Sequence, residues 1–263
     1  MLTKKQQIDK TLKRIRLRIS GQKGKAFPVF VFGEQRSGTN MMVSILNRSK
    51  ETECYNENDE EAFKDYVLKD PAILSKLINQ SYAKAVIFKS ISDSQNANKL
   101  LSMYAGAKGI WLYRRYQDVI NSSLISFKEH NKYLYYILFE PEKAGWRGEN
   151  VSQENMKLIE KYYNKGISDT SARALIWYLR NYQYFQQSLD KEDRVLLVSY
   201  DKLVGHPRSQ FSGIFDFIGI KYVPAWTNSV FSTSVKKYAP PEIDPDIQDL
   251  CEKMYERLEG ISR

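Results

Sequence analysis

The sequence predicts an α/β protein: a three-layer sandwich in which helices cover both faces of a central parallel sheet that carries a phosphate-binding loop. Three observations predict this fold. Short apolar runs alternate along the chain with amphipathic stretches of helical period. The first junction between such a run and a helix, Gly33–Asn40, is rich in glycine and hydroxyl side chains. The length of 263 residues suits one sizeable domain.

The expected elements follow in chain order. Four apolar runs have the length and composition of buried strands: Phe27–Gly33, Lys84–Lys89, Gly109–Tyr113 and Arg194–Ser199. Helices are expected at Thr39–Asn47, Ala72–Gln80, Gln95–Tyr104, Asp118–Phe127, Arg208–Ile218 and Pro245–Leu258. Residues from about 128 to 192 have a mostly helical, tyrosine-rich pattern. We expect them to cap the sheet within a single domain, residues 26–263, rather than to form a domain of their own.

The first 25 residues form a basic N-terminal arm. They hold nine Lys and Arg residues and one acid, Asp9, which leaves 31 basic and 30 acidic residues in the remainder of the chain. Ile8, Leu12, Ile15 and Ile19 share one helical stripe, although residues 15–19 also alternate like a strand. Such an arm favours peripheral contact with an anionic membrane or another polyanion, or it is a solvated terminus. Specific recognition of nucleic acid is not expected.

Cysteine usage and hydropathy indicate in which cellular compartment the protein works. Cys54 and Cys251 do not make a disulfide framework, and no Cys/His cluster suggests a metal site. No stretch approaches the roughly 18 apolar residues that cross a membrane. The start of the chain also lacks the apolar segment of a signal peptide. We therefore expect a cytoplasmic protein, with any membrane association at the surface.

The loop Gly33–Asn40 has the chemistry of an anion cradle. Glycines let the backbone N–H groups approach a ligand closely, and the start of the following helix adds its dipole. Arg36 adds a positive charge, and Ser37 adds a hydroxyl donor. The spacing is that of a Walker A loop, but Thr39 stands where its lysine belongs, and Asn40 replaces the hydroxyl that holds Mg²⁺. An ATPase or a kinase would thus lack two working parts.

This strand–loop–helix unit resembles the 5′-phosphosulfate loop of the P-loop sulfotransferases, and the chain looks like a bacterial-type member of that family. These enzymes use 3′-phosphoadenosine-5′-phosphosulfate (PAPS). The match covers Arg36, Ser37, Gly38 and Thr39, with Asn40 in place of a second threonine. The resemblance implies that these five residues bind the 5′-phosphosulfate group of PAPS, and that no metal is required.

A second segment resembles the 3′-phosphate signature of the same family, a strand that ends in Arg and a helix that places Ser eight residues later. Here these residues are Arg114 and Ser122, with Asp118 in its expected place and Tyr116 where a proline is usual. A guanidinium at a strand end and a hydroxyl in the next helix can both bind phosphate. A third resemblance, in Ser199–Leu203, implies that Tyr200 lies near the adenine.

Sulfuryl transfer also needs a second cation and a general base. Lys89, at the end of an expected strand, can reach the transferring oxygens. The resemblance to family branches with a carboxylate base assigns that role to Glu57, which stands 21 residues after Arg36. Three other residues remain alternatives for the base: Asp59, Asp93 and His130. His130 is expected at the surface, with a place in the wall of the acceptor pocket as the alternative. Lys236 or Lys237 is a candidate lid contact over the 3′-phosphate.

The sequence thus predicts a PAPS-dependent sulfotransferase that modifies a hydroxyl or amine of a glycan, a lipid or a small molecule. The product nucleotide would be adenosine 3′,5′-bisphosphate (PAP). Two alternatives stay open: a P-loop nucleotide kinase or NTPase, and a non-catalytic module that binds membranes or polyanions through its basic arm. Deletion of residues 1–25 would abolish the main activity of such a module, but would leave transfer to a soluble acceptor intact in the sulfotransferase.

Overall fold

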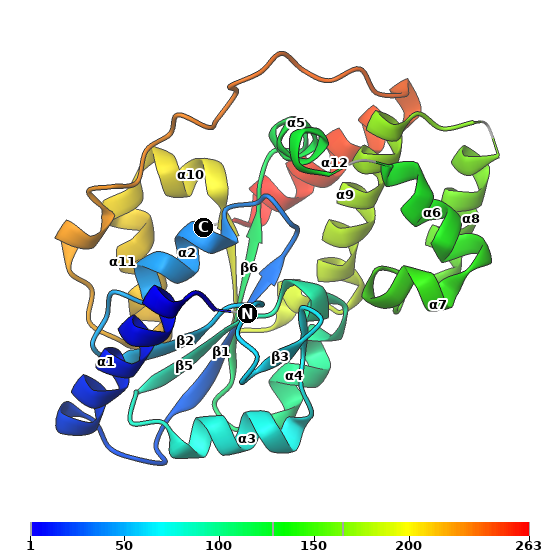
Figure 1. Cartoon of the computed structure of the whole chain (residues 1–263). Helices are drawn as coiled ribbons and strands as arrows, with labels where there is room; N and C mark the ends of the chain where they lie inside the picture. Colours follow the sequence, from blue (N-terminus) through cyan, green and yellow to red (C-terminus); the bar gives the residue numbers. More distant parts are fainter. Residues whose placement is uncertain (1, 128, 165, 263) are drawn as a thin grey trace.

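A parallel sheet of five strands runs through the centre of the protein (Figure 1). The computed structural model describes residues 2–127, 129–164 and 166–262. In chain order the strands of the sheet are β1 (Phe27–Gly33), β2 (Thr52–Tyr55), β5 (Ala85–Lys89), β6 (Lys108–Tyr113) and β7 (Val195–Ser199). Their spatial order is β2-β5-β1-β6-β7, and every neighbouring pair is parallel. The first strand of the sequence is therefore the middle strand of the sheet.

Side chains that alternate along β1 supply both hydrophobic cores. Phe30 and Phe32 point into one core and Val29 and Val31 into the other, and all four are fully buried. This alternation is the period of two that a strand imposes on its side chains. Because both faces are covered, the strand reads in the sequence as one continuous apolar run.

Helices cover the two faces in separate layers, which confirms the predicted three-layer α/β fold. The layer on the Val29 face consists of α2 (Thr39–Leu46), α10 (Tyr200–Gly205) and α11 (Pro207–Ile218). The layer on the Phe30 face contains α3 (Pro71–Gln80), α4 (Ala97–Met103), α5 (Tyr116–Ser126), α6 (His130–Phe139), α8 (Gln153–Tyr163), α9 (Asp169–Gln186) and α12 (Pro245–Ile261). Figure 1 shows α6, α8 and the short α7 (Pro141–Ala144) grouped beside α9.

The structure differs locally from the predicted elements. The edge strand β2 was not expected, nor was the hairpin of β3 (Phe63–Lys64) and β4 (Val67–Leu68). The helix expected at 95–104 is preceded by a 3₁₀ helix, Ile91–Asn96, and becomes α-helical only at α4. Positions 128 and 165 of the predicted cap lie outside the described residues, and the division of the chain into an arm and a domain stays a prediction.

The basic segment at the start of the chain is helical rather than extended. Thr3 is the N-cap residue of helix α1 (Lys4–Ser20). Its side chain and that of Gln6 form a capping box. Only Leu17 of this helix is fully buried. Among the described helices, none has the length and apolar character that a membrane span requires.

Candidate active site

All five strands of the sheet end at one edge, where each delivers a residue predicted from the sequence. The loop Gly33–Asn40 follows β1, Glu57 follows β2, and Lys89 ends β5. Arg114 follows β6, and Tyr200 follows β7. Because parallel strands place their carboxyl ends side by side, residues from distant parts of the chain gather here, where ligands of such sheets bind.

The loop after β1 keeps the backbone geometry that its glycines predict. Gly38 has a φ of 91° and caps the N-terminus of α2, so the first N–H groups of that helix face the loop. Arg36 also adopts a positive φ, 70°. Ser37 is fully buried, and its hydroxyl has no hydrogen-bond partner among the described residues. A buried, unpaired donor beside a helix N-terminus fits an oxyanion such as the 5′-phosphosulfate.

The two predicted anion sites lie in direct contact. Nε of Arg36 donates a hydrogen bond to Oγ of Ser122 at 2.9 Å. Nη1 of Arg114 donates to the carbonyl oxygen of Arg36 at 3.2 Å. The Nε of Arg114, a residue only 6% exposed, has no partner in the described part of the chain. The groups expected at the two ends of one nucleotide therefore lie side by side.

Tyr200 and a segment near position 234 complete the surroundings of Arg114. The Arg114 guanidinium stacks on the Tyr200 ring, 4.6 Å from its centroid, and also donates to the carbonyl of Ser234. The Tyr200 and Ser234 hydroxyls are hydrogen-bonded at 2.7 Å. The backbone N–H of Lys236 donates to both oxygens of Asp118 at 3.0 and 3.1 Å. It is thus the backbone of this segment, more than its lysine side chains, that contacts the Arg114 site.

Glu57 and Lys89 form an ion pair at the other side of the loop. Lys89 Nζ lies 2.5 Å from Glu57 Oε2, and both residues line a cavity of about 600 Å³ together with Asn40. Burial raises the pKa of Glu57 above the ordinary value of a glutamate, and the Lys89 ammonium opposes part of this rise. The pair thus places a cation and a carboxylate beside the anion-binding loop.

The three alternatives for the base occupy different surroundings. Asp59 pairs with Lys10 of α1. Asp93 accepts the N–H of Leu68 at 3.1 Å, and burial raises its pKa to about 7. His130 is 3% exposed, so its expected surface position is wrong: the helices around it bury the ring, which lowers its pKa to about 4.

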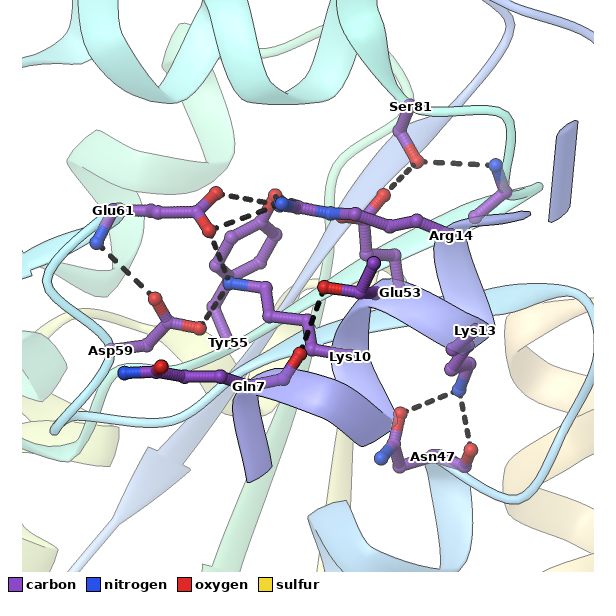
Figure 2. Close-up of polar contacts among 12 residues, drawn as sticks. Gln7, Lys10, Lys13, Arg14, Asn47, Glu53, Tyr55, Asp59, Glu61 and Ser81 are labelled. Atoms are coloured by element: carbon purple, nitrogen blue, oxygen red, sulfur yellow. Dashed lines mark hydrogen bonds and ion pairs between the residues drawn. The ribbon is translucent and has the colours of Figure 1, made fainter. Parts of the chain in front are cut away.

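Helix α1 forms one wall of the cavity that holds Glu57. Figure 2 shows its basic side chains pointing toward hydrogen-bond acceptors in the rest of the protein. Lys10 pairs with Asp59 and Glu61, and Lys13 binds the carbonyl and side-chain oxygens of Asn47. Arg14 is 2.6 Å from both Glu53 and Glu61 and donates to the Tyr55 hydroxyl at 2.9 Å. Deleting residues 1–25 would thus also remove a wall of the cavity.

Several of these contacts have no local signal in the sequence. Glu34 lies inside the loop but is 4% exposed and binds Arg173 of α9 at 2.8 Å, 139 residues away. Ser234 reaches Arg114 across 120 residues. Periodicity and short motifs report neighbours in sequence, so neither pairing could be found by them. Among the described residues, no group of three or more His, Cys, Asp or Glu side chains could hold a metal ion.

Fold and site together define a nucleotide-binding α/β protein whose phosphate loop lacks the Walker lysine. Comparison with known proteins names the class. The family model for the sulfotransferase domain matches residues 28–239, and the chain therefore belongs to the sulfotransferase family. It is a sulfotransferase, and the family match favours this assignment over the kinase and the non-catalytic module.

Solved structures share the fold at low sequence identity. The chain is similar to the sulfotransferase domain of the Synechococcus PCC 7002 olefin synthase, with 14% identity, a TM-score of 0.50 and coverage of 90% of this chain and 96% of that one. A sulfotransferase from Alicyclobacillus acidocaldarius matches with 16% identity, a TM-score of 0.51, and coverage of 91% and 95%. No curated protein sequence matches the chain.

Proposed function

We propose that this protein transfers the sulfuryl group of PAPS in line to a hydroxyl or amine acceptor, with Glu57 as the general base. The acceptor belongs to a glycan, a lipid or a small molecule. The observation that carries the proposal is the Glu57–Lys89 ion pair, which lies in the cavity beside the phosphate loop. It combines the two groups that sulfuryl transfer needs beyond the nucleotide site: an acceptor for a proton and a cation for developing charge.

The residues of the loop would hold the 5′-phosphosulfate. Backbone N–H groups of Gly38, Thr39 and Asn40 at the start of α2 bind its oxygens, and the free hydroxyl of Ser37 donates to the same group. Arg36 turns from Ser122 toward the transferring oxygens and balances their charge.

The 3′-phosphate would bind between Arg114 and Ser122. Arg114 has an unpaired Nε, and Ser122 gains a free hydroxyl when Arg36 leaves it. Tyr200 holds the Arg114 guanidinium by stacking and lines the nucleotide site near the adenine.

In the reaction, PAPS supplies the sulfuryl group and carries the phosphate that leaves. Glu57 takes the proton of the acceptor as the acceptor atom bonds to sulfur and the sulfur–oxygen bond to phosphate breaks. Lys89 has two tasks here. Its charge opposes the effect of burial on the pKa of Glu57, and it neutralises charge on the equatorial and leaving oxygens.

Substitution of Glu57 tests this assignment. Glu57→Gln should bind PAP like the wild type but lower kcat by at least about 10²-fold, the low end of acid–base contributions. Glu142→Gln, at an exposed position, serves as the matched control. Wild-type turnover in Glu57→Gln together with lost turnover in Asp93→Asn would assign the base to Asp93 instead.

The outward face of α1 supports contact with a membrane surface. Ile8, Leu12, Ile15 and Ile19 form an exposed stripe on the side opposite Leu17. Exposed basic residues border the stripe on both sides: Lys4, Lys5, Arg16 and Arg18. An apolar stripe between basic borders is the pattern of a helix that lies in an anionic lipid interface, whereas a polyanion would leave the stripe in water. We place the protein in the cytoplasm, at the membrane surface.

A further inference from the structure

A second cavity lies next to the phosphate loop, on the side of α5, α6 and α9. Its volume is about 30 Å³, and its wall includes Glu34 and Gln35 of the loop. Gln35 directly precedes Arg36, and the lining residue Ser123 directly follows Ser122. Two residues of its wall are therefore direct sequence neighbours of groups that would bind the nucleotide.

Positive charge dominates the wall of this cavity. Three arginines line it, Arg147, Arg173 and Arg180, together with one carboxylate, Glu34. Glu34 accepts a hydrogen bond from Arg173 at 2.8 Å and lies 3.6 Å from Nε of Arg180. Within the cavity wall, one carboxylate thus faces three guanidinium groups, and Asp93 and Glu149 act on Arg180 from outside the wall.

Several donors that face the cavity are unpaired. Nη1 of Arg173 and Nε of Arg180 have no hydrogen-bond partner among the described residues, and these side chains are only 2% and 4% exposed. Nε2 of the buried His130 is also unpaired. Buried polar groups in folded proteins nearly always have partners, so unpaired guanidinium nitrogens from two side chains around one space indicate a ligand that supplies acceptors.

Arg147 adds a charge without a counter-ion. Its guanidinium stacks on two rings, 4.3 Å from the Tyr133 centroid and 4.2 Å from that of Trp146, and the described residues provide it with no ion pair. Burial, and to a lesser degree the nearby Arg173, lower its pKa below the ordinary value of an arginine. An anion in the cavity would offset the cost of burying the Arg147 charge and the repulsion between Arg147 and Arg173.

We propose that this cavity binds a carboxylate of the acceptor, so that the enzyme sulfates molecules that carry an acidic group besides the reacting hydroxyl or amine. The proposal rests on the proposed function for the transfer itself. A space of about 30 Å³ has room for about two water-sized groups, which suits the two oxygens of a carboxylate better than the bulkier phosphate or sulfate. Phe127, Ile137 and Ile176 line the same space, so we expect the part of the acceptor next to the carboxylate to be apolar or aromatic and to extend out of the cavity.

Matched pairs of ligands test the preference without requiring turnover. Benzoate, phenylacetate and hexanoate are each compared with the corresponding primary amide by ligand-observed NMR, with PAP present and ionic strength held constant. We expect the acids to bind the wild type at least about tenfold more tightly, because hydrogen bonds to charged groups are the stronger ones. Arg147→Gln should remove most of this difference.

Arg147 suits this test because its side chain holds no ion pair of the core, whereas changes at Arg173 or Arg180 would break buried contacts. Lys143→Gln is the control, a nearby exposed cation that pairs with Glu140. It should keep the preference for acids. Equal binding of acids and amides, no binding of any acid, or an unchanged preference in Arg147→Gln would overturn the proposal.

Two further measurements separate this inference from the function on which it rests. Calorimetry with PAP should give the same affinity for Arg147→Gln and the wild type, because Arg147 lies outside the nucleotide site. Transfer to 4-hydroxyphenylacetate should exceed transfer to its amide in kcat/KM, and Arg147→Gln should raise KM for the acid more than it lowers kcat. If PAP fails to bind while the acids still do, the proposed function fails and the carboxylate site stands.

Discussion

Nε of Arg36 donates a hydrogen bond to Oγ of Ser122 across 86 residues of sequence, at 2.9 Å. Arg36 belongs to the loop after β1, and Ser122 belongs to the helix after β6. The two residues were each expected to bind a different phosphate of the same nucleotide. Their contact places the two residues side by side, and we expect a bound nucleotide to replace this hydrogen bond.

Gly38 should not tolerate a side chain. A Cβ atom at this position would lie 2.2 Å from Cδ2 of the Tyr200 ring, and the φ of 91° adds strain of about 1–2 kcal/mol for any other residue. We expect Gly38→Ala to lower PAP affinity by at least about tenfold and to reduce Tm, because a shifted Tyr200 also releases Arg114. Gly205→Ala is the control, since nothing lies within 4 Å of its added Cβ. Wild-type PAP affinity in Gly38→Ala would show that this packing does not shape the site.

Loss of Lys89 should shift the pH dependence of the reaction. Glu57 acts as a base only when ionised, and burial raises its pKa while Lys89 opposes the rise. In Lys89→Met that opposition is gone, so the pKa of Glu57 rises further and the acid limb of the kcat profile moves to higher pH. Lys99→Met, on the exposed side of α4, should leave the limb in place. An unmoved limb in Lys89→Met would mean that another group titrates there.

The ion pairs of α1 should contribute to stability. Arg14→Met removes contacts with Glu53 and Glu61 and leaves the buried Glu53 carboxylate with only its neutral donors, Ser81 and Tyr55. Because the Arg14 side chain is about one third exposed, we expect a moderate loss of about 1–2 kcal/mol. Thermal unfolding measures it, with Arg18→Met on the exposed face of the helix as the neutral comparison. Equal Tm values for the two variants would argue that these contacts do not hold α1 against the rest of the protein.

The outer face of α1 should bind anionic bilayers. Wild-type protein should co-sediment with vesicles that contain phosphatidylglycerol, less with pure phosphatidylcholine, and less at high salt, because counter-ions screen the attraction. Ile15→Ser combined with Ile19→Ser should weaken binding by at least about tenfold through lost apolar burial. Gln22→Ser, beyond the end of the helix, should not. Undiminished binding by the double variant would leave only the charges as an explanation.

The part of the site that the sequence could predict consists of local motifs. The loop at 33–40 and the pair Arg114 and Ser122 each lie on one strand–turn–helix unit, so a few neighbouring residues define both the backbone and the chemistry. The edge strand β2 was missed because Thr52–Tyr55 has only four residues, of mixed polarity. The hairpin that follows was missed because its turn uses Asp65 and Tyr66 at positive φ without a glycine.

Contacts between distant segments explain the remaining differences. The basic side chains of α1 suggested a solvated surface, but Lys10 and Arg14 face carboxylates at positions 53–61 that only the folded chain brings near. His130 follows a polar stretch, yet α9 places Arg173 close to it and the ring is buried. The charge of a side chain alone does not show whether it is exposed to water or packed against an opposite charge.

Calorimetric titration with PAP in the presence of EDTA tests the central claim, that the two anion sites bind one nucleotide. The account predicts one PAP per chain, no requirement for Mg²⁺, and an affinity lower by at least about tenfold in both Arg36→Ala and Arg114→Ala. No binding heat would contradict it. So would two binding sites per chain, with each substitution abolishing only one of them.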